Sequence, residues 1–266
     1  MKKILITGQN SYVGKNLANW LGRFPNKYFV ESISLRDNNW MKVNFSDYDV
    51  VVHLAAIVHK KEKPEMENTY FKVNRDLPIE VATIAKKAGV KQFIFMSTMA
   101  VYGQEGLIGR NVIITKETKP KPKTYYGRSK LEAEYELEKL SQVNFKVLIY
   151  RPPMIYGPNS PGNYRKLEKL ALKTPIFPMI NNNRSMLHID KLCLFINEAI
   201  DTIADGLRLP QDDKYFNTSM LVKNIAEQNG RKIVLLKSLG LIIKILGNKL
   251  SLTRKIFGNL VYEIEK

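Results

Sequence analysis

A tyrosine and a lysine four residues apart are the pair in this sequence best suited to acid–base chemistry. Tyr126 and Lys130 belong to the segment Tyr-Gly-Arg-Ser-Lys, and residues at positions i and i+4 of a helix share one face. A lysine ammonium beside a tyrosine favours the phenolate and lowers the pKa of the phenol. Such a tyrosine can donate or accept the proton at a carbonyl or alcohol oxygen. The pair therefore predicts proton transfer at an oxygen of this kind.

A second pair with the same spacing, Tyr135 and Lys139, lies in the same predicted helix, so position has to separate the two pairs. Tyr126 opens the helix, at the edge of the sheet where ligands bind in parallel α/β folds. Tyr135 lies mid-helix between two glutamates, which is typical of a surface or packing residue. Tyr126 and Lys130 are therefore the predicted acid–base pair.

A threonine that follows a predicted strand offers a third polar group. Thr98 comes after the apolar run Gln-Phe-Ile-Phe-Met, and a hydroxyl at the carboxyl end of a parallel strand lies in the crevice where ligands bind. Thr98 is expected to hydrogen-bond the substrate oxygen beside Tyr126. The alternative is that Ser97 or Thr98 only caps a turn.

Two glycines six residues apart follow the first predicted strand. A phosphate-binding turn needs glycine where the chain turns sharply and where the helix packs close to the strand, and Gly8 and Gly14 meet these needs. The helix that begins here directs its N-terminal N–H groups at a pyrophosphate. Ser11 takes the middle position, where a third glycine is usual. The turn predicts a dinucleotide site, and the alternative is an ordinary strand–helix turn.

The end of the second predicted strand bears on the choice of cofactor. An acid near this point holds the ribose 2′-hydroxyl of NAD, whereas an arginine pairs with the 2′-phosphate of NADP. The sequence has Arg36 followed by Asp37. Arg36 favours NADP(H) as the cofactor, and Asp37 leaves NAD(H) as the alternative. A third interpretation is that Arg36 is only a solvated charge in a loop.

Short apolar segments alternate with helical patterns over the first 150 residues. Strands this apolar are typical of a parallel sheet covered on both faces. The alternation predicts an α/β fold with a Rossmann-type doubly wound parallel sheet. The predicted strands are 3–7, 29–35, 49–55, 92–96 and 146–150, and the predicted helices are 12–21, 77–88 and 125–140.

Prolines and glycines cluster after Arg151, and the regular alternation stops there. We therefore expect an NAD(P)-binding Rossmann domain over 1–151 and a smaller substrate-binding lobe over 152–266, with some return of the chain to the first domain. The segment 231–266 is basic and apolar. Packing of amphipathic helices onto the body of the protein is the favoured interpretation, and contact with an anionic membrane is the alternative.

Composition narrows the classes of partner. The chain has 266 residues, a net charge of +17 and one cysteine. The positive charge suits polyanionic partners, although a lysine-rich proteome explains it as well. Nucleic acid is not expected because no nucleic-acid motif is present, and no metal site is predicted. Cys193 is expected in the core. With no signal peptide, no membrane-spanning stretch and no internal disulfide, a cytoplasmic protein is expected.

Taken together, motifs in order over residues 1–190 resemble an extended short-chain dehydrogenase/reductase of the NAD-dependent epimerase/dehydratase family. Each motif is weak alone, and their joint occurrence is specific. The motifs are Thr7-Gly8…Gly14, His53-Leu54-Ala55-Ala56, Val73-Asn74, Ser97-Thr98…Val101-Tyr102-Gly103, Tyr126…Lys130, Arg151-Pro152-Pro153…Tyr156-Gly157-Pro158 and Arg184…His188-Ile189-Asp190.

The resemblance implies roles for individual residues. Thr98, Tyr126 and Lys130 would form the catalytic trio, and Lys130 would also hold the nicotinamide ribose. Asn163 and Arg184 would grip the diphosphate of a nucleotide-sugar, and Thr98, Met99 and Tyr126 would complete the substrate contacts. The implied cofactor contacts are Gly8, Ser11, Tyr12, Val13, Gly14, Arg36, Asn44, Phe45, Leu54, Ala55, Ala56, Asn74, Ser97, Tyr126, Lys130 and Pro153.

Within the family, the pattern looks most like bacterial capsule and O-antigen enzymes. This resemblance implies an NAD(P)H-dependent reductase acting on the 4-keto group of a UDP-2-acetamido-2,6-dideoxy-hexos-4-ulose. The alternatives are a UDP-hexose or N-acetylhexosamine 4-epimerase with tightly bound NAD and a non-catalytic cofactor-binding scaffold. Dehydration ranks lower because Met99 and Ala100 follow Thr98, where dehydratases carry acids. A homodimer through the helix of Tyr126 is also implied.

Overall fold

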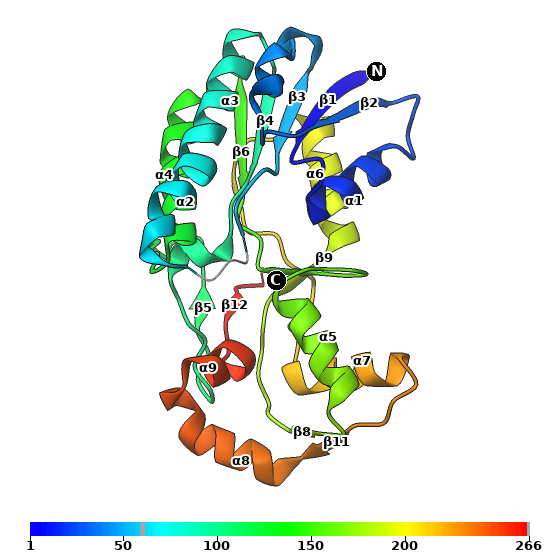
Figure 1. Ribbon diagram of the computed structural model, residues 1–266, viewed down its shortest axis with the longest axis vertical. Helices are drawn as coiled ribbons and strands as arrows, with labels where there is room; N and C mark the ends of the chain where they lie inside the picture. The colour runs from blue at the N-terminus through cyan, green and yellow to red at the C-terminus, as the bar shows by residue number, and fades with distance from the viewer. Residues whose placement is uncertain (59–61, 265–266) are drawn as a thin grey trace. The chain divides into compact units, whose positions relative to one another are not determined.

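The computed structural model describes residues 1–58 and 62–264, and within them the chain forms two compact units (Figure 1). The first unit comprises Met1–Gly103, Pro120–Pro152 and Ile189–Pro210, and the second comprises the intervening segments and the chain from Gln211 on. The chain crosses between the units several times, both before and after Arg151.

The first unit is built on a six-stranded sheet in which every pairing is parallel. The strand order β10-β6-β4-β3-β1-β2 reverses direction at β1, so the crevice for a ligand lies at the carboxyl ends of β1 and β3. This sheet confirms the predicted doubly wound fold. The strands are β1 (Lys2–Thr7), β2 (Tyr28–Ile33), β3 (Val50–His53), β4 (Gln92–Met96), β6 (Lys146–Tyr150) and β10 (Gly206–Arg208).

Helices cover both faces of this sheet (Figure 1). α3 packs against α4 on one face, and α1 packs against α6 on the other. Alanines on the first pair, including Ala82 and Ala133, let the helices approach Phe93 and Val147 of the sheet, and all four side chains are buried. The helices of this unit are α1 (Tyr12–Leu21), α2 (Glu67–Phe71), α3 (Leu77–Lys87), α4 (Tyr125–Leu140) and α6 (Ile189–Thr202).

The second unit has its own small core, to which Phe177, Val222 and Phe257 contribute. Its strands form two-stranded pairs, β5 with β12, β7 with β9 and β8 with β11. No described helix in either unit has the length and hydropathy of a membrane-spanning helix. The elements are β5 (Ile113–Ile114), β7 (Met154–Tyr156), α5 (Asn163–Lys173), β8 (Ile176–Pro178), β9 (Met186–His188), α7 (Thr218–Gln228), β11 (Val234–Leu236), α8 (Lys237–Leu246), α9 (Ser251–Phe257) and β12 (Val261–Tyr262).

Candidate active site

The turn between β1 and α1 has no room for larger side chains at its glycines. Gly8 has φ +83°, and a Cβ there would lie 2.8 Å from the backbone nitrogen of Ala55. A Cβ on Gly14 would lie 2.7 Å from the carbonyl oxygen of Gly8. Ser11 caps α1 by accepting a hydrogen bond of 2.9 Å from the Gly14 N–H. A close-packed turn that opens a helix fits the phosphates of a dinucleotide, and the residues present therefore fit an NAD(P) cofactor.

Substitution of Gly14 with valine is expected to abolish NADH binding, since the side chain would meet the Gly8 carbonyl and displace the turn. The binding is measured by NADH fluorescence. The control is Gly89→Ala, where no atom lies within 4 Å of a Cβ. Its φ of +84° makes alanine cost about 1–2 kcal/mol of stability, but Gly89 precedes β4 at the amino end of the sheet, so this variant should bind NADH as the wild type does. NADH binding that survives Gly14→Val would remove this turn from the cofactor site.

The trio of Thr98, Tyr126 and Lys130 meets at the start of α4. Thr98 and Tyr126 share a hydrogen bond, and the Lys130 ammonium donates a bond of 2.8 Å to the Met96 carbonyl at the end of β4. Lys130 also lies over the Phe95 ring, with its Nζ atom 4.3 Å from the ring centroid. The fold therefore places these three side chains on two elements that meet at the carboxyl edge of the sheet.

The expected lowering of the Tyr126 pKa is not seen in this arrangement. Burial raises the pKa of Tyr126 to about 12, and the hydrogen bond with Thr98 opposes this only in part. Burial also lowers the pKa of Lys130 to about 7, against the charge of Glu134. Desolvation disfavours both charged forms, so burial acts against the phenolate of Tyr126 and against the ammonium of Lys130. Tyr126 is therefore protonated at neutral pH.

The lowered pKa of Lys130 predicts a pH dependence of stability. Between about pH 7 and the ordinary lysine value of 10.5, the folded protein binds fewer protons at this residue than the unfolded chain, so the free energy of unfolding rises with pH. Lys130→Met should lack this rise and should be more stable than the wild type at pH 7. Urea unfolding at pH 7 and pH 10 measures the difference. A Lys139→Met control should follow the wild type, and an identical rise in Lys130→Met would contradict the assignment.

A buried ion pair lies one helical turn beyond Lys130. The Nε atom of Arg151 is 3.1 Å from each carboxylate oxygen of Glu134, and its Nη1 atom donates a bond of 2.9 Å to the Tyr102 hydroxyl. The Ser97 hydroxyl donates to the same carboxylate. Glu134 and Arg151 are 0% and 5% exposed. The pair therefore ties α4 to the carboxyl ends of β4 and β6.

Asn74 holds the chain after β3. Its side-chain oxygen accepts a bond of 2.8 Å from the Ile57 N–H, and its amide donates a bond of 3.1 Å to the Ile57 carbonyl. Asn74 is fully buried and lies in a π-helical turn, Lys72–Asp76. Turns of this kind often occur at functional sites because they redirect one side chain out of the helical repeat. Asn74 is one of the implied cofactor contacts, and its side chain holds the backbone at Ile57.

A carboxylate that the sequence analysis did not single out binds the first turn of α4. Glu62 accepts bonds of 2.9 Å and 3.0 Å from the N–H groups of Tyr125 and Tyr126. Thr124 caps the same helix by accepting a bond of 3.0 Å from the Gly127 N–H. A helix N-terminus favours negative charge, so Glu62 helps to fix the backbone of Tyr126. No sequence signal marks it, because it lies in a run of lysines and glutamates before Pro64.

The variant Glu62→Gln tests this role of Glu62. It loses the charge and one of the two acceptor oxygens, so a loss of about 1–3 kcal/mol in the free energy of unfolding is expected. Chemical denaturation measures it. The matched control is Glu65→Gln, whose carboxylate is exposed and lies 3.7 Å from the Lys63 ammonium, and it should be near neutral. Equal effects of the two substitutions would argue against Glu62 as a positioning residue.

The adenosine-side candidates follow β2. Arg36 is exposed, whereas the Asp37 carboxylate accepts a bond of 3.0 Å from the Asn39 N–H and caps a short helix. Asn44 caps the next turn through the Ser46 N–H, at 3.3 Å. Phe45 packs into the core of the first unit. Arg36 and Asp37 are both exposed at this point, but the Asp37 carboxylate already accepts a backbone hydrogen bond.

The substrate-side candidates fall in both units. Met99, in the first unit, donates its N–H to the Pro152 carbonyl at 2.9 Å. Asn163 opens α5 and Arg184 donates a bond of 3.0 Å to the Gly258 carbonyl, both within the second unit. Burial lowers the pKa of Arg184. The contact of Asn163 and Arg184 with a diphosphate remains a prediction.

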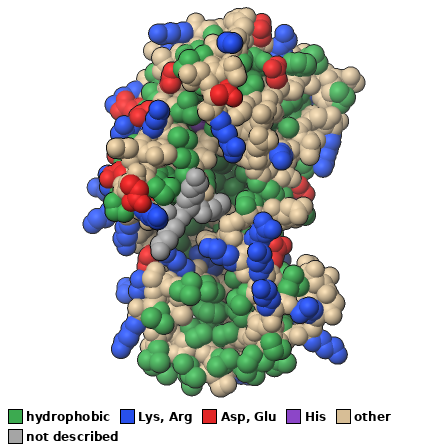
Figure 2. Space-filling model, viewed as in Figure 1, with side chains coloured by type: hydrophobic (Ala, Val, Ile, Leu, Met, Phe, Trp, Pro, Cys, Tyr) green, Lys and Arg blue, Asp and Glu red, His purple; other side chains and the backbone are tan. Residues whose placement is uncertain are grey.

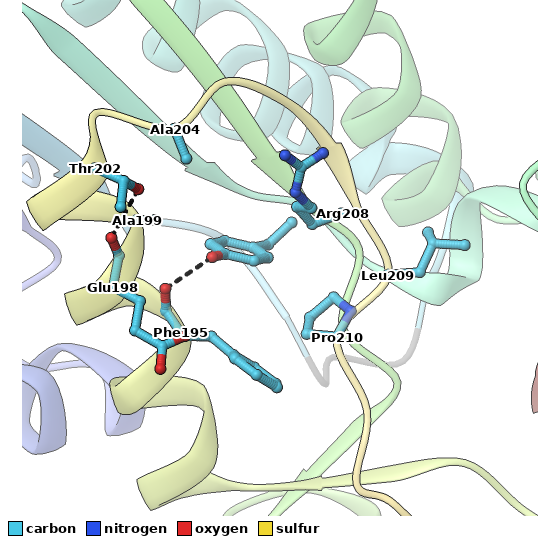
Figure 3. Close-up of a pocket in the computed structure, with 9 residues that line it drawn as sticks. Phe195, Glu198, Ala199, Thr202, Ala204, Arg208, Leu209 and Pro210 are labelled. Carbon is cyan, nitrogen blue, oxygen red and sulfur yellow. Dashed lines mark hydrogen bonds between the residues drawn. The ribbon is translucent and has the colours of Figure 1, made fainter. Parts of the chain in front are cut away.

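A separate hollow of about 450 Å³ lies in the first unit between α6 and β10. Figure 3 shows Phe195 and Glu198 on the helix and Arg208 on the strand around it. Tyr150 donates its hydroxyl to the Phe195 carbonyl at 2.9 Å. None of the trio lines this hollow, so it is distinct from the acid–base group.

Comparison with known proteins identifies a family. Residues 4–190 match the model of the NAD dependent epimerase/dehydratase family. A UDP-glucose 4-epimerase of Vibrio cholerae is 31% identical over 249 residues, which cover 85% of this chain and 75% of that protein. The N-acetyl-alpha-D-glucosaminyl-diphospho-ditrans,octacis-undecaprenol 4-epimerase of Escherichia coli O157:H7 is 26% identical over 252 residues, with 86% and 73% covered.

The fold also has a counterpart among solved structures. The UDP-glucuronic acid 4-epimerase of Bacillus cereus in complex with NAD superposes with a TM-score of 0.75 at 19% identity and covers 99% of this chain and 90% of its own. At this identity the likeness concerns the fold.

Proposed function

The chain belongs to the NAD-dependent epimerase/dehydratase family and is an NAD(P)-dependent enzyme, and from this premise we propose that it inverts C4 of a UDP-hexose or UDP-N-acetylhexosamine. The observation that carries the proposal is that Tyr126 bonds Thr98 while Lys130, on the same helix, bonds the Met96 carbonyl at the end of β4. Both curated relatives named above are 4-epimerases. In both names the substrate is a sugar that carries a diphosphate on its anomeric oxygen.

The side chains of the trio divide the proton transfer between them. A bound NAD(P) supplies the acceptor and donor of hydride. In each turnover of a 4-epimerase the Tyr126 phenolate would first accept the proton of the C4 hydroxyl and would then return it to the C4 oxygen when the ketone is reduced on its other face. Burial raises the pKa of Tyr126 to about 12, and the positive charge of a bound oxidised nicotinamide would favour the phenolate that the first of these transfers needs. Thr98 bonds the phenol and orients its hydroxyl, and Lys130 fixes the end of β4 through the Met96 carbonyl.

Net reduction of a 4-keto-sugar with NADPH is the second candidate, and Arg36 favours it. Arg36 is exposed at the end of β2, and the neighbouring Asp37 carboxylate already caps a helix. An arginine at this point suits a 2′-phosphate. An epimerase regenerates its cofactor in each cycle, whereas a reductase must exchange it, and NADPH is the common reductant.

Two measurements on the purified protein separate the candidates. Chromatography of the denatured protein identifies any retained cofactor, and the product of incubation with UDP-N-acetylglucosamine is resolved from its C4 epimer. Retained NAD with epimer formed and no change at 340 nm supports the epimerase. Stoichiometric loss of NADPH absorbance with a UDP-4-keto-6-deoxy-N-acetylhexosamine supports the reductase and contradicts the epimerase. Failure of both reactions would contradict both candidates.

A further inference from the structure

Six large apolar side chains on and after α8 are exposed to solvent. Their exposed fractions run from 52% to 69%, which is unusual for side chains of this size gathered in one place. Figure 2 shows hydrophobic side chains massed over the region where Figure 1 draws α8. We call these residues the tail face, and they are Leu241, Ile242, Ile245, Leu246, Leu250 and Leu252.

The orientation of α8 is fixed from its other side. A Cβ on Gly240 would lie 1.9 Å from the Met179 carbonyl oxygen, so the helix backbone rests directly on that chain. Ile243 packs against the core of the second unit, and Gly247 is buried. The helical repeat of 3.6 residues then turns the four α8 members of the tail face away from that core. Gly240, Ile243 and Gly247 therefore form the side of α8 that packs onto the second unit, as expected for this segment. The tail face is not covered by this packing.

Basic side chains border the tail face. Lys237 and Lys244 lie seven residues apart on α8, both exposed, and Lys249 and Lys255 follow, also exposed. Residues 231–262 contain seven lysines and arginines and no aspartate or glutamate. Two copies of such a face would bring like charges together, which disfavours self-association. An apolar face with a one-signed basic border is complementary to an anionic lipid surface.

We propose that the tail face is a docking surface for an anionic lipid bilayer. Leu241, Ile242 and Ile245 enter the boundary between headgroups and acyl chains, and Lys237 and Lys244 contact the phosphates. The helix lies in the plane of the surface and does not cross it. This proposal uses only residues of the second unit and does not depend on which reaction the enzyme performs.

Flotation of the full-length protein with vesicles tests the proposal. The vesicles are phosphatidylcholine alone or phosphatidylcholine with about one-third phosphatidylglycerol. We expect the protein to float with the anionic vesicles and to remain behind with the neutral ones. Lys237→Gln with Lys244→Gln should weaken binding more than about ten-fold, since each lysine near an anionic surface contributes about five-fold. Leu241→Ser with Ile245→Ser should abolish flotation, because the apolar insertion is lost.

Two controls distinguish the tail face from general basicity. Lys87→Gln with Lys139→Gln removes two exposed lysines of the first unit and should float as the wild type does. Sedimentation equilibrium follows the oligomeric state of every variant, and circular dichroism shows that each is folded. Flotation lost equally in both lysine pairs would overturn the proposal. So would a wild-type dimer, without flotation, that Leu241→Ser with Ile245→Ser dissociates, because the face would then cover a second copy.

Discussion

Replacing Tyr126 with phenylalanine is expected to lower kcat by about 10²- to 10⁴-fold while cofactor binding stays near the wild-type level. Phenylalanine keeps the ring and removes the hydroxyl that bonds Thr98. Since burial keeps this phenol protonated at neutral pH, it is the acid at hand for an alkoxide at the sugar. The rate is measured by chromatographic separation of the product or by absorbance at 340 nm, according to the reaction found.

Tyr135→Phe is the matched control for this prediction. Tyr135 lies on the same helix, is 49% exposed and precedes Lys139 with the same spacing that separates Tyr126 from Lys130. Its substitution should leave kcat unchanged. Thr98→Val should reduce kcat less than Tyr126→Phe does, because Thr98 orients the phenol and does not supply the proton. Wild-type turnover in Tyr126→Phe would show that another group is the acid.

The local patterns of the sequence predict the elements of the first unit closely. The bounds predicted for α1, β4, α4 and β6 are the observed ones. The apolar pattern that identifies each of these elements and the residues that end it are local features of the sequence. The predictions for β2 and β3 each extend two residues too far at the carboxyl end. The last paired residues are Ile33 in β2 and His53 in β3. Apolar residues follow both, so the hydrophobic pattern continues after the pairing has ended.

Features that depend on distant contacts could not be predicted in this way. The short strand β10 pairs with β6 across more than fifty residues of chain, and no local pattern marks it. Glu134 lies next to Tyr135 in a charged stretch of α4 that is typical of a surface, yet it is buried and pairs with Arg151, which directly follows β6. Glu62 binds α4 across a similar separation. Glu134 and Glu62 both bind the helix that carries Tyr126 and Lys130. The catalytic role of Thr98, Tyr126 and Lys130 stays a prediction.

Substitution of Glu134 with glutamine is expected to destabilise the protein by about 3–5 kcal/mol. Arg151 is 5% exposed and would keep a buried charge without its carboxylate. Glutamine keeps one acceptor oxygen for the donors of Arg151 and Ser97, which now share two. For a chain of this size, such a loss corresponds to a fall of about 10 °C in Tm. The charge of Glu134 also raises the pKa of Lys130, so the same variant should extend the neutral form of Lys130 to lower pH. Calorimetry measures Tm, and urea unfolding across pH measures the second effect.

The destabilisation should come from the unpaired charge and not from the lost contact, and two variants separate these causes. Glu136→Gln changes an exposed carboxylate two residues along α4 whose partner is Lys139 at 2.7 Å, and surface pairs of this kind contribute about 0–1 kcal/mol. Glu134→Gln with Arg151→Met removes both buried charges, so much of the stability should return. If the double variant recovers stability but not turnover, the ion pair serves mainly to hold α4 and the end of β4 in register for Tyr126. If the double variant is no more stable than Glu134→Gln, the bond from Arg151 to Tyr102, which the double variant also removes, carries the stability of this end of the sheet.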